Sequence, residues 1–547
     1  MTEPSVVALR RLRRTRQLHR LGSLDWFEVA YRVYLFALLG GGALLMVSDT
    51  VKDTPVEGAA LADVVEFGPR VVGLVVTLVV LAGLCGGANG GPLALEGADV
   101  AHVMLAPIDR RTALARPAVQ RLRAALFAGA GVGGVAGQLA GRRLPGTVLA
   151  WFASGALFGA TAALLWFGAS LLAHTLRIPR WLATGAGVGL CLWQGAALAW
   201  GVPGPASTTG RLALWGWYQR PIDLVGAAVA VAATVAGLAL LRRISLDALA
   251  RRSTLVAQLR FAVTMQDLRT VILLRRQLNQ EYTRARPWLA LRRGGVASFT
   301  RGVWRRGWHG LLRFPAGRLV RMSALSIGIG LLHAAAVRGT TPAFVGAALA
   351  SFVLGLELLE PLSQEVDQPD HTDSLPVDRG ELMARHLLAP LVALVPFAVL
   401  AGAAAVASLG ADALAPAAIL ALPLLAAGVT GSIVSVVRDA PDPAASAAQQ
   451  TFVPPEVAGL TTSVRLAWPL VVSAVGSAMV MFPRSAWEHG GSTVAGAVRG
   501  ALGAVLLVIV VGYWVKVRDH VHRRVRAFLS EGRDYTATQR VARRELP

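Results

Sequence analysis

Residues 92–110 read PLALEGADVAHVMLAPIDR, and residues 361–379 read PLSQEVDQPDHTDSLPVDR. The two stretches lie 269 positions apart without a gap. They share Pro-Leu and a glutamate near the start, and Pro, Asp and Arg at the end. Chance can supply one short Pro-x-Asp-Arg match, but several identities at a single offset indicate an internal duplication.

Each copy of this turn follows an apolar run that is long enough to cross a membrane. A helix needs about 20 apolar residues to span the hydrocarbon core, and about 17 are still sufficient. Twelve runs qualify or nearly qualify: residues 26–47, 71–87, 124–140, 148–173, 181–202, 224–241, 322–337, 343–359, 387–409, 413–437, 466–482 and 494–515. The sequence therefore predicts an all-α polytopic membrane protein with about twelve transmembrane helices.

The composition favours the same class. Of the 547 residues, 54% are hydrophobic and 16% are charged, and the net charge is +22. These proportions exclude a disordered chain and disfavour a cytosolic enzyme. Every basic side chain except Lys52 and Lys516 is arginine, and an apolar, basic chain is typical of a membrane protein whose arginines collect at water-facing helix ends. Cys85 and Cys191 each lie in an apolar run and indicate no disulfide framework.

Arginine accumulates at the start, in the centre and at the end of the chain; residues 242–321 contain eighteen arginines. Because cationic segments near helix ends are retained in the cytoplasm, we expect both termini and the centre to be cytoplasmic, in a multi-pass protein of a bacterial plasma membrane. Arg142 and Arg143 fall outside and break this rule. The predicted segments are a cytoplasmic amphipathic helix (1–25), a first six-span half (26–241), a basic cytoplasmic linker with amphipathic helices (242–320), a second six-span half (321–515) and a basic cytoplasmic tail (516–547).

Two parts of the linker have an apolar stripe at helical spacing. One runs from Phe261 to Ile272, and the other contains Trp304, Trp308 and Leu311. Both are interleaved with arginine, which favours amphipathic helices at anionic lipid headgroups. A solvated or protein-packed face is an equal alternative. We expect no nucleic-acid binding, because nothing resembles a base-reading module.

An even number of predicted spans separates the two turns, so both turns face the same side and the halves are predicted to be parallel repeats. In each copy a new helix begins at Asp109 or Asp378, because aspartate is a favourable N-cap residue. A single copy would indicate only an ordinary turn between two helices at the membrane boundary. Two matched copies favour a shared docking role. The predicted docking residues are Glu96, Pro107, Asp109, Arg110 and Arg116 in the first copy, and Glu365, Pro376, Asp378, Arg379 and Arg385 in the second.

The motifs of several catalytic classes are missing from the sequence. With lysine only at positions 52 and 516, the chain has no P-loop and does not hydrolyse ATP by that route. It also has no H-E-x-x-H, C-x-x-C or G-x-S-x-G motif. His371, between Asp370 and Asp373, is more typical of a solvated turn than of a metal site. We therefore expect a protein that is not an enzyme and carries no metal or cofactor.

A few polar residues occur at membrane depth, where burial is costly and usually functional. Gln138, Gln194 and Glu357 are the candidates for a translocation path, although an interhelical hydrogen bond is the stronger interpretation of Gln194. His333 and Arg499 lie near outer helix ends, where a long side chain can reach water.

At the Pro-x-Asp-Arg turns the sequence resembles the integral-membrane permease subunits of ABC-type exporters, of the type-2 kind. In that family a basic amphipathic helix precedes the first span, and a cytoplasmic helix-turn-helix docks on the ATPase. Residues 9–25 and 92–116 correspond to these parts in the first half, and residues 299–318 and 361–385 in the second. The sequence QDLRTV at residues 266–271 resembles the linker of fused, two-half actinobacterial permeases. The resemblance implies that separate ATPase subunits, in two copies, bind ATP and Mg²⁺ and drive an exporter.

Two other classes remain as alternatives. An ion-coupled secondary transporter also often has twelve spans in two parallel halves, but no carboxylate lies at a predicted span centre to carry protons. A scaffold or membrane enzyme is the third class, and the sequence contains no catalytic constellation for it.

Overall fold

The computed structural model describes residues 55–88, 108–247, 298–368, 374–438 and 455–544 continuously, together with short stretches and single residues between them. For residues 455–466 and 522–544 it describes the helical backbone alone. Within these ranges nine helices are long and apolar enough to cross a membrane, or eleven when each of two bent helix pairs counts as one span. The described chain contains no β-strand. The predicted all-α, multi-span class is therefore confirmed.

Several predicted features lie outside the described residues, apart from single positions. They are the N-terminal amphipathic helix, the first span at residues 26–47, the stripe from Phe261 to Ile272, and the residues Glu96, Pro107 and His371.

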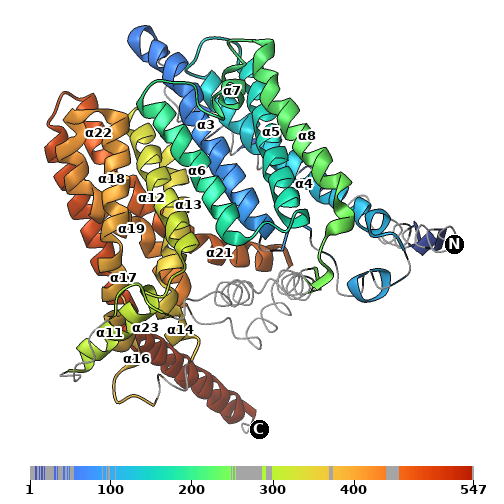
Figure 1. Cartoon of the computed structure of the whole chain (residues 1–547). Coiled ribbons are helices and arrows are strands. Elements are labelled where there is room, and N and C mark those ends of the chain that lie inside the picture. Colours follow the sequence, from blue (N-terminus) through green and yellow to red (C-terminus); the bar gives the residue numbers. More distant parts are fainter. Residues whose placement is uncertain are drawn as a thin grey trace. The chain divides into compact units, whose positions relative to one another are not determined.

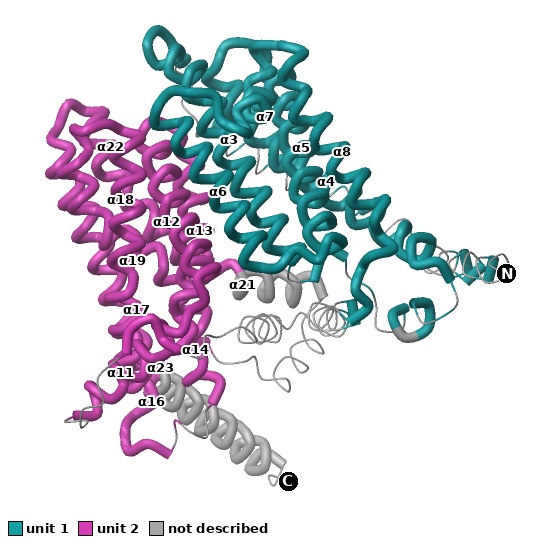
Figure 2. Tube along the Cα trace, viewed as in Figure 1, with its two compact units in different colours: residues 1–278 teal, residues 279–547 magenta. Residues whose placement is uncertain are grey.

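The chain forms two compact units, residues 1–278 and residues 279–547 (Figure 2). Unit 1 contains five long helices: α3 (Gly58–Ala88), α4 (Arg110–Gly141), α5 (Val148–Thr175), α6 (Arg180–Ala199) and α8 (Val225–Ala239). Shorter helical turns connect them: η1 (Asp99–Val103), α7 (Ser207–Arg211), η2 (Leu212–Leu214), η3 (Pro221–Leu224) and η4 (Leu241–Arg243).

Unit 2 begins with the amphipathic helix α11 (Phe299–Leu311) and continues with α12 (Ala316–Val337), α13 (Ala343–Leu358) and α14 (Glu360–Val366). The helices α16 (Arg379–His386), α17 (Leu388–Ala393) and α18 (Val395–Leu409) follow the second turn. The last elements are η5 (Ala411–Ala413), α19 (Leu414–Val437), α21 (Pro455–Ala478), α22 (Met481–Glu488) and α23 (Thr493–Arg544) (Figure 1).

Several helices extend beyond the apolar runs that predicted them. Helix α3 begins at Gly58 rather than at residue 71, and α4 begins at Arg110 rather than at residue 124. Hydropathy detects only the part of a helix that suits lipid, whereas backbone hydrogen bonding continues into polar segments made of good helix formers. For the same reason the predicted tail from residue 516 continues α23 without a break.

Two predicted spans of the second half are bent. The axis turns by 64° between α13 and α14, and by 43° between residues 379–393 and α18. Pro361 and Pro396 occupy the first turn of α14 and of α18. Proline has no backbone N–H and cannot continue a preceding helix without a distortion, so each bend lies where a proline restarts the helix.

The two units share several helix pairs but not all, since α19 also packs against α21 whereas α5 has no comparable contact with α6 among the described residues. In unit 1, α5 contacts α3, α4 and α8, and α3 also contacts α6. In unit 2, α19 contacts α13, α18 and α23, and α13 also contacts α21 (Figure 1). The helix that follows the turn-bearing hairpin, α5 or α19, is thus the central helix of its unit.

The α4–α5 hairpin contains the arginine pair that breaks the charge rule. Helix α4 ends at Gly141 and α5 begins at Val148, so the predicted division at Arg142 and Arg143 is confirmed. Arg142 lies 3.7 Å from the carboxylate of Asp49, and the backbone oxygen of Arg143 accepts a hydrogen bond from Val56. These arginines therefore meet the acidic segment that follows the first predicted span.

Candidate functional site

The two copies of the turn have the same backbone geometry at their ends and differ at their starts, since residues 361–366 lie in α14 whereas Pro92, Leu93 and Leu95 are not helical. The N–H of Ile108 donates to the oxygen of Ala106 over 2.7 Å, and at the equivalent position the N–H of Val377 donates to Leu375 over 2.8 Å. Each is the three-residue hydrogen bond of a γ-turn. The next residue is the N-cap of the following helix in both copies, with φ and ψ of −58° and 124° at Asp109 and −58° and 131° at Asp378. The likeness in backbone geometry is thus confined to the Pro-x-Asp-Arg end of each copy.

Both aspartates occupy the predicted N-cap position, but neither side chain caps its helix. The carboxylate of Asp109 instead lies 3.1 Å from Nε of Arg242, in the η4 turn that follows α8. This pair is largely exposed, so its direct contribution to stability is small. It nevertheless joins the start of α4 to the end of the last span of unit 1.

In unit 2 the helix that starts at the second turn makes a comparable junction through a close backbone contact. A Cβ atom on Gly380, in the first turn of α16, would lie 2.2 Å from the backbone oxygen of Lys516. Only glycine permits this approach of α16 to α23. In each unit, therefore, the helix that starts at the turn contacts the cytoplasm-predicted end of the unit's last helix.

The other predicted docking residues differ in what they contact. Arg110, Pro376 and Asp378 are exposed, and Arg116 and Arg379 are half-buried. Arg379 donates to the backbone oxygen of Val366 over 3.5 Å. Arg385 pairs with Glu381 at 2.5 Å and lies over the ring of Phe299. Fewer of the predicted docking residues are therefore exposed than the sequence predicts.

Glu365 is the clearest departure from that set. It is 2% exposed, and its carboxylate lies 2.7 Å from Nη2 of Arg306 and 3.9 Å from Nε2 of His386. Through Arg306 it fixes α11 against α14. The tryptophans of α11, Trp304 and Trp308, pack against the core of unit 2, so the protein-packed alternative describes this amphipathic face.

Glu357, a candidate for the translocation path, lies in a buried ion-pair cluster. Its two carboxylate oxygens are 2.9 Å from Nε of Arg318 and 2.8 Å from Nη2 of Arg321. Arg318 also donates to the backbone oxygen of Glu357 and lies 3.7 Å from Glu360. The ring of Phe314 covers the Arg318 guanidinium at 3.8 Å. This cluster joins α12 to the bent α13–α14 pair.

Gln194 is completely buried and makes hydrogen bonds within unit 1. Its Nε2 donates to the backbone oxygen of Arg70 and to Ser207, and its Oε1 accepts from the N–H of Ala206. It therefore connects α6 to α3 and α7, as the interhelical interpretation predicts. Gln138 is half-buried, and its Oε1 has no hydrogen-bond partner among the described residues.

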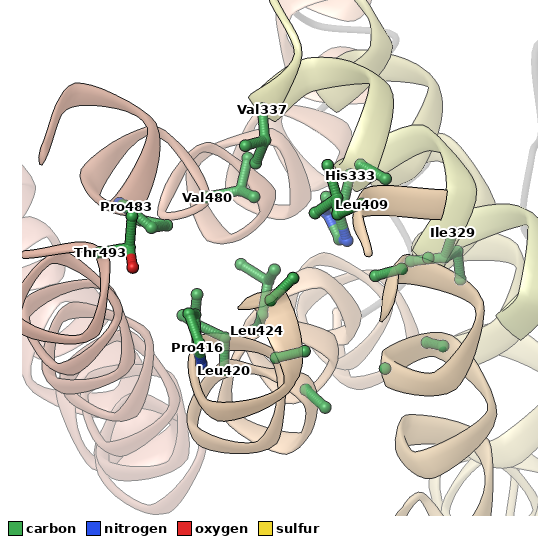
Figure 3. Close-up of a pocket in the computed structure, with 18 of the residues that line it drawn as sticks. Ile329, His333, Val337, Leu409, Pro416, Leu420, Leu424, Val480, Pro483 and Thr493 are labelled. Atoms are coloured by element: carbon green, nitrogen blue, oxygen red, sulfur yellow. The ribbon is translucent and has the colours of Figure 1, made fainter. Parts of the chain in front are cut away.

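Sequence reasoning did not identify a cavity of about 390 Å³ inside unit 2 (Figure 3). Segments of α12, α18, α19, α22 and α23 line it, and most of its lining is apolar. The imidazole of His333 points into it, is 6% exposed, and has no hydrogen-bond partner for Nε2 among the described residues. His333 is visible in the sequence, with Ile329 and Val337 four positions before and after it in α12, but pairing these residues with α18 and α19 requires the fold.

Among the residues that the structure describes, no group of three His, Cys, Asp or Glu side chains is placed to hold a metal ion. Comparison with protein-family models, with curated proteins and with solved structures finds no match to this chain.

Proposed function

We propose that this protein is the membrane-spanning permease subunit of an ABC exporter in a bacterial plasma membrane. In this proposal about twelve spans form two parallel six-helix repeats, with both termini in the cytoplasm. Separate ATPase subunits, which bind ATP and Mg²⁺, dock on the two turns. Their closure moves the turns, and the two halves open a path for the substrate.

The observation that carries this proposal is the recurrence of one backbone geometry at the Pro-x-Asp-Arg end of both turns. The γ-turn bonds and the N-cap conformations of Asp109 and Asp378 agree closely. Two surfaces with one geometry suit two copies of one partner. The matching helix pairs in the two units support the repeat arrangement.

The contacts behind the turns suggest how a partner's movement is passed on. A push on Asp109 reaches α8 through Arg242, and a push on α16 reaches α23 through the close approach of Gly380 to Lys516. The ion pair between the exposed Arg306 and the buried Glu365 holds α11 against α14. We therefore assign contact with the ATPase to the exposed turn residues and a supporting role to Glu365.

The test is to express the tagged chain in its native host and to purify it from membranes together with the P-loop ATPase that we expect to bind it. Asp109→Ala with Arg110→Ala, and Asp378→Ala with Arg379→Ala, should each reduce the copurified ATPase at least about tenfold, as loss of central contacts does. The control is Arg142→Ala with Arg143→Ala, which removes a basic pair from the opposite end of α4. Equal recovery of the ATPase with all variants would contradict the docking role.

Sidedness gives a second, independent test. Arg110→Cys and Arg379→Cys should react with a membrane-impermeant maleimide from the same side of sealed vesicles, in a chain whose Cys85 and Cys191 are replaced by alanine. Reaction of the two positions from opposite sides would exclude parallel repeats.

An ion-coupled secondary transporter is the second candidate, and His333 is the observation that favours it. An imidazole inside an apolar cavity can carry a proton during transport. Purified protein in liposomes without any ATPase distinguishes the two proposals. Substrate movement driven by a proton gradient alone, and abolished by His333→Leu, would favour the secondary transporter.

A further inference from the structure

The cavity of unit 2 exists because two helices touch at one point and separate beyond it. A Cβ atom on Gly330 of α12 would lie 2.0 Å from the backbone oxygen of Ala401 of α18, so the backbones are in direct contact there. Toward the ends of these helices the lining residues on α18 and α19 include Ala405 and Ala417, which fill little volume. The gap between the helices is therefore left open.

The cavity is elongated along the helix axes. On α12 its lining extends from Ile329 to Arg338, which corresponds to roughly 13 Å at 1.5 Å per residue. At one end lie Leu424 and Leu425, which are almost completely buried. At the other end, where α12 and α18 end and α19 begins, lie the exposed residues Arg338 and Asp412.

This mouth is a defined part of the fold. Arg338 donates to the backbone oxygen of Ser408 at the end of α18. Arg484 of α22 donates to the backbone oxygen of Ala336 over 3.1 Å and to Thr341 over 2.7 Å, and pairs with Glu488 at 2.8 Å. The ends of α12 and α22 are thus joined, and the guanidinium of Arg338 is kept at the rim.

His333 lies between the two ends. It is five residues before Arg338, about 7 Å deeper along the helix at 1.5 Å per residue. Its buried Nε2 has no partner among the described residues, and a buried polar atom without a hydrogen bond is costly. A ligand that supplies an oxygen at this depth removes that cost.

We propose that this cavity binds a single-chain amphiphile: an alkyl chain against the apolar end, and a carboxylate or ester head group between His333 and Arg338. The polar mouth, the one buried imidazole and the apolar interior match the order of groups in such a molecule. The volume lies in the range of small-molecule sites. This site is separate from the turns, and it does not depend on the proposed ATPase.

A photoreactive ligand tests the proposal. The chain is placed in liposomes with an octanoic acid analogue that carries a diazirine in its chain, and the labelled peptides are identified by mass spectrometry. We expect saturable labelling of the peptides around Ile329 and Leu424, displaced by unlabelled octanoic acid. Ala405→Phe and Ala417→Phe, which fill the cavity from two different helices, should each lower the labelling at least about tenfold. Val399→Phe is the matched control, because Val399 is on α18, is 63% exposed and does not line the cavity.

The role of His333 is tested by a second pair of variants. His333→Leu removes the hydrogen bond and should weaken binding of the acid about tenfold, whereas His333→Gln should retain most of it. An alkyl diazirine without the carboxylate should label wild type and His333→Leu equally.

Three results would overturn the proposal. The first is labelling that does not saturate or that persists in both filled variants. The second is equal binding of the acid to wild type and to His333→Leu. The third is labelling by a phosphatidylcholine with the same diazirine but none by the acid, since the cavity is then only a lipid-facing groove.

Discussion

Units 1 and 2 share the geometry of the turn but differ in the contacts that hold their helices together. In unit 1, α4 and α5 pack through glycine, and a Cβ atom on Gly133 would lie 2.1 Å from the backbone oxygen of Gly155. In unit 2, ion pairs of buried glutamates join α12 to α13 through Glu357 and α11 to α14 through Glu365. The comparison teaches that a duplicated backbone motif can be kept while the contacts behind it diverge.

The largest expected loss of stability comes from breaking the ion-pair cluster of unit 2. Glu357→Gln removes the carboxylate between Arg318 and Arg321, and leaves buried positive charge without full compensation. Breaking a buried pair in this way costs about 3–5 kcal/mol. We expect a clear fall in the midpoint of thermal unfolding, followed by tryptophan fluorescence in detergent.

The matched control is an exposed pair in unit 1. Glu66 lies 3.8 Å from Arg70 and its side chain is 60% exposed. Glu66→Gln should therefore cost less than about 1 kcal/mol. Equal effects of the two substitutions would show that burial does not distinguish the pairs.

The second prediction concerns the glycine contact of unit 1. Gly133→Val forces α4 away from α5, and overpacking of this kind costs about 1–3 kcal/mol and sometimes more. Gly131→Val is the control, because a Cβ atom on Gly131 meets nothing within 4 Å. The yield of monodisperse protein and its unfolding midpoint should fall for Gly133→Val alone.

The third prediction concerns the ion pair that holds α11 against the rest of unit 2. Arg306→Gln removes the ion pair that joins α11 to Glu365, and leaves that buried carboxylate less well compensated, at a cost of about 1–2 kcal/mol. Hydrogen exchange of the amides in α11 should become faster, whereas exchange in α19 should not change. Arg301→Gln, on an exposed position of the same helix, should leave both unchanged.

The smallest loss of stability is expected from a substitution in the first turn. Asp109→Asn weakens an exposed pair with Arg242, which is worth at most about 1 kcal/mol. Its unfolding midpoint should stay near that of the wild type. A loss of ATPase copurification in this variant would then report on docking, and a large loss of stability would instead identify Asp109 as a structural residue.

The sequence predicted the membrane class, the division at Arg142 and Arg143, and the helix starts at Asp109 and Asp378, because apolar length and N-cap residues are local signals. It did not predict the burial of Glu365 or the pairing of Glu357. Both depend on arginines far away in the chain, Arg306 and Arg318, which sequence spacing does not bring together. The cavity around His333 was missed for the same reason, since its walls come from five helices.

Helix α23 is one unbroken element of 52 residues from Thr493 to Arg544. Thr493 lines the cavity, and Lys516 contacts the helix that starts at the second turn. These two points are roughly 35 Å apart on the same rod, at 1.5 Å per residue. If α23 tilts about a point between them, Thr493 and Lys516 move in opposite directions. The unbroken helix therefore couples the occupancy of the cavity to a force on the second turn.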